Sequence, residues 1–121
     1  MPPSPTAPEH DLDTAFAALS DPVRRSLVTR LAHGDATVGE LAQPFSLTQQ
    51  AISHHVAVLR RCGLIEQRRE GTRRPCRLRV QNLTLLRTWI DDQRQVWDDR
   101  LDALEQHLDR ERPHQRGGAG R

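Results

Sequence analysis

The chain has 121 residues, a length typical of one domain, and a formal net charge of +2. Its eighteen basic residues are all arginines, and two Phe, two Trp and no Tyr are available to fill a core. No apolar run approaches the length of a membrane span and the N-terminus lacks a signal-peptide pattern, so we expect a cytoplasmic protein.

The chain begins with a segment whose composition disfavours folding. Residues 1–10 contain four prolines and are expected to be a disordered tail, as are the glycine-rich residues 113–121 at the other end. A domain of residues 11–112 is expected between these tails. Its first element is a short helix of residues 12–19, with Leu12 and Phe16 on one face.

Two further helices follow from their start signals. Asp21 as N-cap and Pro22 at the first helical position predict a helix that runs to about Ala32. Residues 37–40, Thr-Val-Gly-Glu, have the pattern of a capping box and open a short helix that must end before Pro44.

The next predicted helix, about residues 48–62, carries the strongest functional signal. Thr48 is a suitable N-cap and Gly63 a suitable stop, and the apolar residues between them fall on one face. The opposite face has no acid and offers amides, hydroxyls and imidazoles, which suit base edges in a major groove. With the short helix before it, this segment predicts a helix-turn-helix. The residues expected to read bases are Thr48, Gln49, Gln50, Ser53 and His54, and Arg60 and Arg61 are expected to contact phosphates.

An arginine-rich hairpin is predicted at about residues 65–80. Strand-like runs at residues 64–69 and 75–80 flank a turn at residues 70–74. A twisted ribbon with a basic tip can serve as a wing that reaches phosphates or a minor groove. The alternative is a solvated charged face, which the neighbouring helix disfavours. The wing residues expected to contact phosphates are Arg68, Arg69, Arg73, Arg74 and Arg77.

A long helix is predicted at about residues 83–110, capped by Asn82 or Thr84. Its apolar stripe spans seven turns, longer than a small domain can cover from within. One alternative is a helix folded back on its own core, but an intermolecular seam is favoured, since this thin core leaves buried surface to be supplied by dimerisation. The residues expected at the dimer interface are Leu12, Phe16, Leu86, Ile90, Trp97, Leu101, Leu104 and Leu108.

Charge is distributed unevenly along the chain. Residues 15–88 carry twelve arginines and five acids, whereas residues 89–112 carry four arginines and eight acids. A basic middle with acidic flanks is expected if the middle contacts nucleic acid and the flanks do not.

The two cysteines, Cys62 and Cys76, are fourteen residues apart and form no CxxC pair. They could act as a redox switch or as half of a metal site. Two semi-buried structural thiols are the favoured interpretation, and whether either thiol is reactive stays open.

The order of these elements resembles the ArsR-type winged-helix regulators of bacteria. The resemblance covers about residues 12–108. It rests on five blocks in the family's order: ALSDPVRR at residues 18–25, VGELA at 38–42, AISHHVAVL at 51–59, GLI at 63–65 and REG at 69–71.

The resemblance implies a mainly α winged helix-turn-helix with a small β-hairpin and with N- and C-terminal dimerisation helices. It further implies that His54 points to DNA, while His55 aligns with a family histidine that is commonly structural. We expect His55 to face the interior and hold its helix against a neighbour.

The sequence departs from the family at its metal sites. Metal-sensing members use a cysteine pair in or beside the first helix of the helix-turn-helix, and residues 38–47 have none. Other members bind zinc through Asp and His on the last helix, where this chain has only His107 before Pro113. We therefore expect no metal and no cofactor, and any small-molecule effector stays unknown.

These features predict a homodimeric repressor that binds an inverted-repeat operator in double-stranded DNA. An enzyme is excluded because the candidate pairs His54–His55, Asp91–Asp92 and Asp98–Asp99 are adjacent on helices and diverge by about 100°. One alternative is a sequence-tolerant architectural DNA-binding protein. Another is a dimeric interaction protein that has lost DNA binding. The operator sequence, the regulated genes and the choice between repression and activation stay open.

Overall fold

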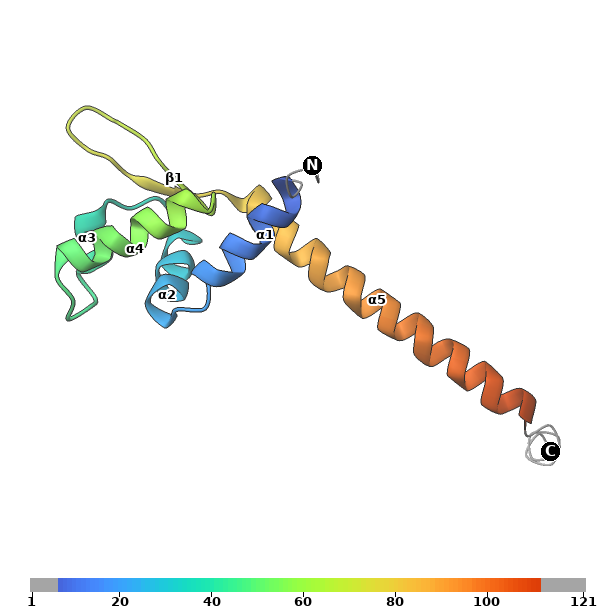
Figure 1. Ribbon diagram of the computed structural model, residues 1–121. Helices are drawn as coiled ribbons and strands as arrows, with labels where there is room; N and C mark the ends of the chain where they lie inside the picture. The colour runs from blue at the N-terminus through green and yellow to red at the C-terminus, as the bar shows by residue number, and fades with distance from the viewer. Residues whose placement is uncertain (1–6, 112–121) are drawn as a thin grey trace, which may run out of the picture. The chain divides into compact units, whose positions relative to one another are not determined.

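The computed structural model describes residues 7–111, with side chains from Leu12 onward (Figure 1). The chain divides into two units, Met1–Leu86 and Arg87–Arg121. Of the tails expected to be disordered, residues 1–6 and 113–121 lie outside the described residues, whereas residues 7–10 belong to the first helix. The elements are α1 (Ala7–Ala18), α2 (Pro22–Leu31), α3 (Val38–Ala42), α4 (Gln49–Arg61), β1 (Ile65–Gln67), β2 (Cys76–Leu78) and α5 (Val80–Glu111).

The predicted fold class, mainly helical with one small hairpin, is confirmed. The first helix starts at Ala7, five residues before the Leu12 that the apolar pattern indicated. The start of α2 is as predicted: Pro22 occupies its first turn, and an Asp21 carboxylate oxygen accepts from the Arg24 amide at 3.0 Å. Leu27 on α2 is fully buried.

The capping box that opens α3 is also confirmed. The Thr37 hydroxyl accepts from the Glu40 amide at 3.2 Å, and the Glu40 carboxylate accepts from the Thr37 amide at 2.9 Å. These bonds satisfy amides that a five-residue helix would otherwise leave unpaired, so α3 has a fixed start.

Helix α4 has the predicted start, stop and buried face. Its N-cap is Thr48, and Gly63 follows its C-terminus with φ of 83°, a conformation that favours glycine. Ile52, Val56 and Leu59 are buried and pack with α1, α2 and α3 in one core.

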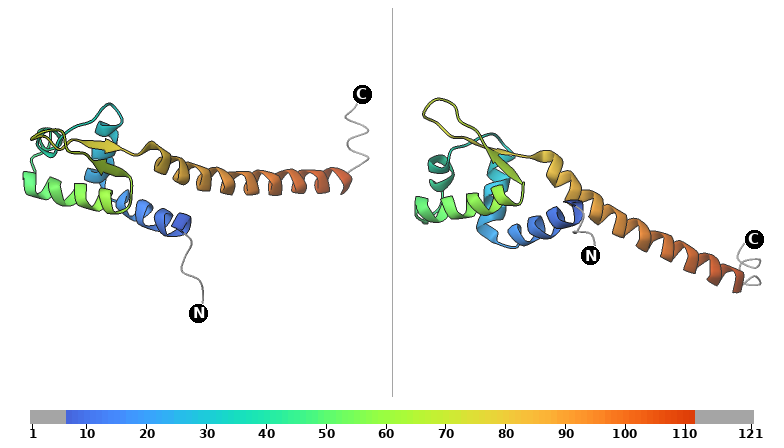
Figure 2. Two further views of the ribbon diagram at one scale, coloured as in Figure 1. Left: turned by 90° about the horizontal axis from the view of Figure 1, so that it is seen from above. Right: turned by 45° about the horizontal axis from the view of Figure 1, so that its top comes forward.

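The hairpin extends from the first unit on the side of α3 and α4 (Figures 1 and 2). Its antiparallel strands pair Ile65 with Leu78 and are shorter than predicted. Beyond the strands, single backbone hydrogen bonds replace the regular ladder. The Arg68 amide donates to the Pro75 carbonyl at 2.9 Å, but Pro75 has no amide hydrogen with which to donate back to Arg68. The loop before α3 joins the base of the hairpin through a bridge between Ala36 and Cys76.

Both cysteines lie in the core of the first unit and are more buried than the semi-buried thiols expected. The Cys62 thiol donates to the Leu59 carbonyl at 3.2 Å. Burial raises the pKa of the Cys76 thiol, so the neutral thiol is the favoured form there.

Helix α5 does not use either predicted cap. It begins at Val80, so Asn82 and Thr84 lie inside its first turns. The Asn82 amide donates to the Gly63 carbonyl and the Thr84 hydroxyl to the Val80 carbonyl. Leu86 was expected at the dimer interface. Its side chain is instead only 6% exposed and belongs to the core of the first unit.

The described part of the second unit is residues 87–111, all of them on α5. Every one of these residues is exposed. Its large apolar side chains are Trp89, Ile90, Val96, Trp97, Leu101, Leu104 and Leu108. Among residues 7–111, no helix combines the length and the apolar composition needed to cross a bilayer.

Gly63 gives a test of how α4 is terminated. A Cβ there would lie 3.0 Å from the Asn82 amide nitrogen, on a backbone that disfavours L side chains. We expect Gly63→Ala to lower the free energy of unfolding by about 1–2 kcal/mol in urea titrations. Gly39→Ala is the control, because its Cβ would point into nearly open space on a helix, where Ala gains about 0.5–1 kcal/mol over Gly. Equal losses at both positions would contradict this explanation.

Candidate nucleic-acid interface

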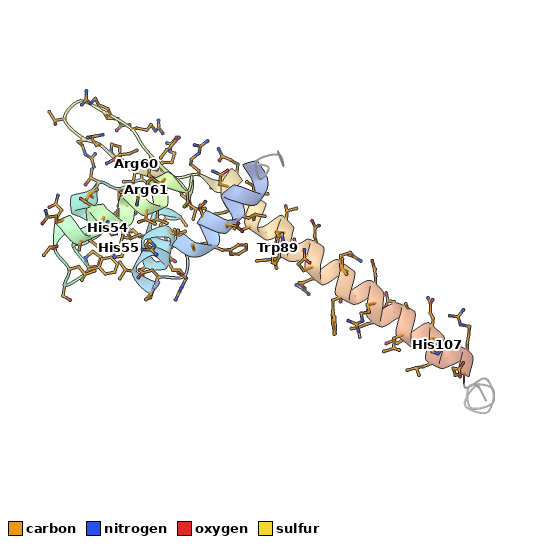
Figure 3. All side chains as sticks on the ribbon, viewed as in Figure 1. His54, His55, Arg60, Arg61, Trp89 and His107 are labelled. Carbon is orange, nitrogen blue, oxygen red and sulfur yellow. The ribbon has the colours of Figure 1, made fainter. Side chains whose placement is uncertain are left out.

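The polar side chains in the first turns of α4 are exposed, with Gln50 and His54 opposite the buried face and Gln49 at the N-terminal end of the helix. Gln49, Gln50, Ser53 and His54 are all exposed, and His54 is labelled in Figure 3. Thr48 is exposed too, but its hydroxyl accepts from the Ala51 amide at 3.0 Å as the N-cap. The first two turns of α4 therefore present amide, hydroxyl and imidazole groups to solvent.

His55 serves the packing of α4, as expected. It is half-buried, and its Nδ1 accepts from Arg24 Nη1 at 3.2 Å. Arg24 Nε also donates to the Ala18 carbonyl at 2.6 Å, so one guanidinium links the ends of α1 and α2 to the middle of α4. Asp21 Oδ2 lies 4.0 Å from the same imidazole nitrogen. The hydrogen bond from the Arg24 backbone amide lowers the pKa of Asp21, and the positive charge of Arg24 adds to this effect.

The C-terminal end of α4 is connected to the hairpin. Arg60 Nη1 donates to the Gln67 side-chain oxygen at 2.7 Å, and the Gln67 amide donates to the Arg74 carbonyl at 3.1 Å. Arg60 was expected to contact phosphates. In this structure it instead joins α4 to β1, and through Gln67 to the returning arm of the hairpin.

Three arginines of the hairpin that were predicted to bind phosphates lie close to carboxylates outside the hairpin. Arg77 approaches both carboxylate oxygens of Asp35, with its Nη2 at 3.2 Å from Oδ2, and Arg68 lies 4.0 Å from the same oxygen. Arg73 donates to Glu40 at 3.0 Å. The capping bond from the Thr37 amide is the main cause of the lowered pKa of Glu40, and Arg73 contributes to it.

The remaining predicted phosphate contacts are Arg69, Arg74 and Arg61, whose side chains are exposed. Arg69 and Arg74 flank the turn of the hairpin. Two arginines of the wing are therefore exposed and form no ion pair within the described residues, while three lie close to carboxylates. The assignment of all five to phosphates stays a prediction.

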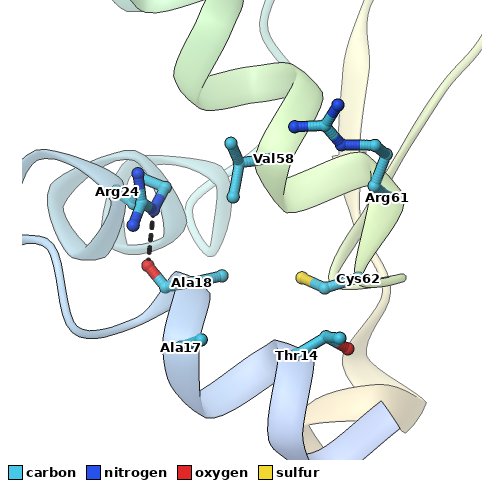
Figure 4. Close-up of a pocket in the computed structure, with 7 residues that line it drawn as sticks. All are labelled: Thr14, Ala17, Ala18, Arg24, Val58, Arg61 and Cys62. Carbon is cyan, nitrogen blue, oxygen red and sulfur yellow. Dashed lines mark hydrogen bonds between the residues drawn. The ribbon is translucent and has the colours of Figure 1, made fainter. Parts of the chain in front are cut away.

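A shallow, largely apolar pocket of about 270 Å³ lies at the C-terminal end of α4 (Figure 4). Its lining residues are Thr14, Ala17, Ala18, Arg24, Val58, Arg61 and Cys62. Arg61 therefore lies beside α1, at the opposite end of α4 from the exposed amides.

Within the described residues, no three His, Cys, Asp or Glu side chains come together as possible ligands for a metal ion. His107 is exposed on α5 (Figure 3). Sequence reasoning missed the contacts of Asp35, Glu40 and Gln67 with arginines, although it placed Glu40 in the capping box. A signal was present for the first two, since they are two of only five acids among residues 15–88.

Comparisons with known proteins agree with this geometry. A family model described as a helix-turn-helix domain matches residues 19–68. The chain is 40% identical to the HTH-type transcriptional regulator Rv2034 of Mycobacterium tuberculosis over 99 residues, 82% of this chain and 90% of that one. It is 37% identical to the transcriptional repressor SdpR of Bacillus subtilis over 60 residues, 50% of this chain and 67% of the repressor.

Solved structures show the same arrangement. An ArsR-like transcriptional regulator from Rhodococcus sp. RHA1 superposes with a TM-score of 0.72 at 32% identity, covering 79% of this chain and 91% of that one. The homodimeric winged helix-turn-helix DNA-binding domain of Mb0332 from Mycobacterium bovis gives a TM-score of 0.57 at 27% identity, covering 77% and 83%.

The two capping carboxylates predict how stability depends on pH. Because folding lowers the pKa of Asp21 and Glu40, each contributes stability that is present above its ordinary pKa near 4 and is lost as the pH falls through the lower, folded pKa. We expect Asp21→Asn, which keeps a capping side chain, to flatten the fall in the urea midpoint between pH 6 and pH 2.5. Glu70→Gln, an exposed carboxylate in the hairpin turn, is the control. An unchanged acid profile in Asp21→Asn would contradict the prediction.

Proposed function

Because the chain belongs to the ArsR family of winged helix-turn-helix transcriptional regulators, we propose that it acts as a homodimeric repressor of an inverted-repeat operator. Members of this family are DNA-binding regulators rather than enzymes. The observation that carries the proposal is the exposed face of α4, which presents Gln49, Gln50, Ser53 and His54 with no acid among them.

Base readout by α4 follows from the chemistry of that face. Glutamine can pair with adenine through two hydrogen bonds in the major groove, and serine and histidine can donate or accept at either kind of pair. Helix α4 presents these groups in its N-terminal turns, the part of a recognition helix that contacts base edges. His55 does not take part in this readout, because a hydrogen bond from Arg24 on α2 holds its ring on the packed side of α4.

The wing supplies the contacts that do not depend on sequence. Arg69 and Arg74 are exposed beside the turn, and guanidinium groups bind phosphate oxygens with two parallel hydrogen bonds. Such contacts set the position of a protein on the duplex and make its affinity fall with salt.

Dimerisation is supported by apolar surface that one copy leaves uncovered. Trp97 is 54% exposed, and Leu101, Leu104 and Leu108 follow it on α5 at spacings of three and four. Apolar surface exposed to water is unfavourable, so a second copy that covers these side chains would stabilise the helix. The homodimeric Mb0332 domain supports the same assembly, and the repressor SdpR supports repression as the outcome of binding.

Two other functions fit fewer observations. A sequence-tolerant architectural DNA-binding protein would gain little from the mixed amide, hydroxyl and imidazole groups of α4, because such proteins bind chiefly through the minor groove and the deformability of the duplex. A dimeric interaction protein without DNA binding would leave both the acid-free face of α4 and the outward arginines of the hairpin without a role.

Substitutions can separate base readout from positioning. We expect Gln49→Ala or His54→Ala to cost about 1–3 kcal/mol of binding free energy on the operator and little on scrambled DNA. Arg74→Ala should weaken binding to both DNAs alike and reduce the salt slope by about 1. Gel shifts with the upstream DNA of the protein's own gene and with a scrambled competitor measure both quantities. If Arg74→Ala alone changed base preference, the roles of α4 and the wing would be reversed.

The interface on α5 can be tested by burying charge in it. Leu101→Asp with Leu104→Asp should give monomers in sedimentation equilibrium, because two carboxylates would be desolvated in the seam. Operator affinity should then fall by about 100-fold or more, since linkage of two half-site contacts is lost. Val96→Asp is the matched control, on the same helix, 66% exposed and beside the stripe. A dimer that survives the double substitution would move the interface elsewhere.

A further inference from the structure

Two acids outside the hairpin contact the arginines of the wing, although carboxylates near DNA repel phosphates. Asp35 lies in the loop between α2 and α3, and Glu40 is on α3. We propose that Asp35 is a positioning residue for DNA binding, which fixes the wing through Arg77. This inference rests on the proposed function, since it assigns how the wing of that same surface is held.

The base of the hairpin is joined to the loop before α3 by both backbone and side chains. Ala36 and Cys76 exchange two hydrogen bonds, from the Ala36 amide at 3.2 Å and from the Cys76 amide at 2.7 Å. Directly beside this bridge, Arg77 Nε lies 3.2 and 3.4 Å from the two carboxylate oxygens of Asp35. Arg68 on the opposite arm of the hairpin is 4.0 Å from Asp35 as well. One carboxylate therefore faces both arms of the ribbon.

The hairpin depends on such contacts because it has little stability of its own. Each strand has three residues, and a two-stranded ribbon of that length is not stable alone in water. Toward the tip, Arg73 contacts Glu40, and Gln67 links Arg60 to the Arg74 carbonyl. Glu40 also closes the capping box of α3, so its replacement would disturb that helix. Within residues 7–111, Asp35 caps no helix, so it is the cleaner position to test.

Because Asp35 is negatively charged, two explanations of its contact with Arg77 predict opposite changes in DNA affinity when the carboxylate is removed. If Arg77 bound phosphate directly, Asp35 would compete for it, and removing the carboxylate would strengthen DNA binding. If Asp35 instead holds the wing, its removal releases Arg69 and Arg74 from their place on the duplex and weakens binding, although the protein has become more positive.

The experiment measures operator affinity at several salt concentrations for Asp35→Asn, Arg77→Gln and the double variant. We expect Asp35→Asn to weaken binding about tenfold at moderate salt and to lower the salt slope by about 1–2, as when one or two phosphate contacts are lost. Asp35→Glu should restore most of the affinity. In the Arg77→Gln background, Asp35→Asn should have a clearly smaller effect than in the wild type, because only the 4.0 Å contact with Arg68 is then left to lose.

Glu70→Gln is the matched control, since it removes one negative charge from the same hairpin. Among the described residues, the Glu70 side chain forms no ion pair with an arginine. It should bind operator as tightly as the wild type or more tightly. Stronger or unchanged binding in Asp35→Asn, or additive losses in the double variant, would overturn the proposal.

A measurement without DNA separates this inference from the proposed function. The amides of Arg68 and Glu70 donate across the hairpin to Pro75 and Arg73. In the free protein, Asp35→Asn should accelerate hydrogen exchange of these two amides while exchange in α4 is unchanged. Unchanged exchange in the hairpin would contradict the positioning role. Absence of specific operator binding by the wild type would contradict the proposed function instead, whatever the exchange result.

Discussion

The burial of one face of α4 determines which of its side chains are exposed and how the helix packs in the first unit. Ile52, Val56 and Leu59 have almost no exposed surface, and apolar burial of this kind is the dominant stabilising contribution in a small domain. Once these three side chains face the core, helical geometry directs Gln50 and His54 to solvent. The Arg24–His55 contact then fixes α4 against the ends of α1 and α2. The exposed polar surface of α4 therefore follows from packing, and no described residue of α4 has a positive φ.

Charge on this surface serves two different purposes. Exposed arginines such as Arg69 and Arg74 are available to phosphates, whereas Arg73 and Arg77 lie against carboxylates of the same chain. Under the proposed function, a count of basic residues would therefore overstate the number of phosphate contacts. Exposed ion pairs are individually weak, but several of them together with the Ala36–Cys76 backbone bridge can hold a ribbon that has no core of its own.

Local chemistry in the sequence predicted most of the first unit. Thr48 and Gly63 marked the ends of α4, because capping depends only on neighbouring residues. The pairing of Asp35 with Arg77 could not be predicted in this way, since it joins residues 42 positions apart and leaves no periodic pattern. Leu86 shows a related limit. An apolar stripe continues with the same spacing from the core into exposed helix, so periodicity does not tell at which turn burial ends.

Under the proposed function, α4 of each protomer reads the major groove of one half-site, so that the dimer reads two. Guanine methylation at N7 adds a group to the major groove, where G and A present the acceptors that glutamine and histidine can contact. Methylation interference on the upstream DNA of the protein's own gene is therefore the most direct measurement. We expect interference in two symmetric blocks whose centres lie about 34–36 Å apart, one turn of duplex. Interference without dyad symmetry, or binding insensitive to methylation in the major groove, would contradict the claim.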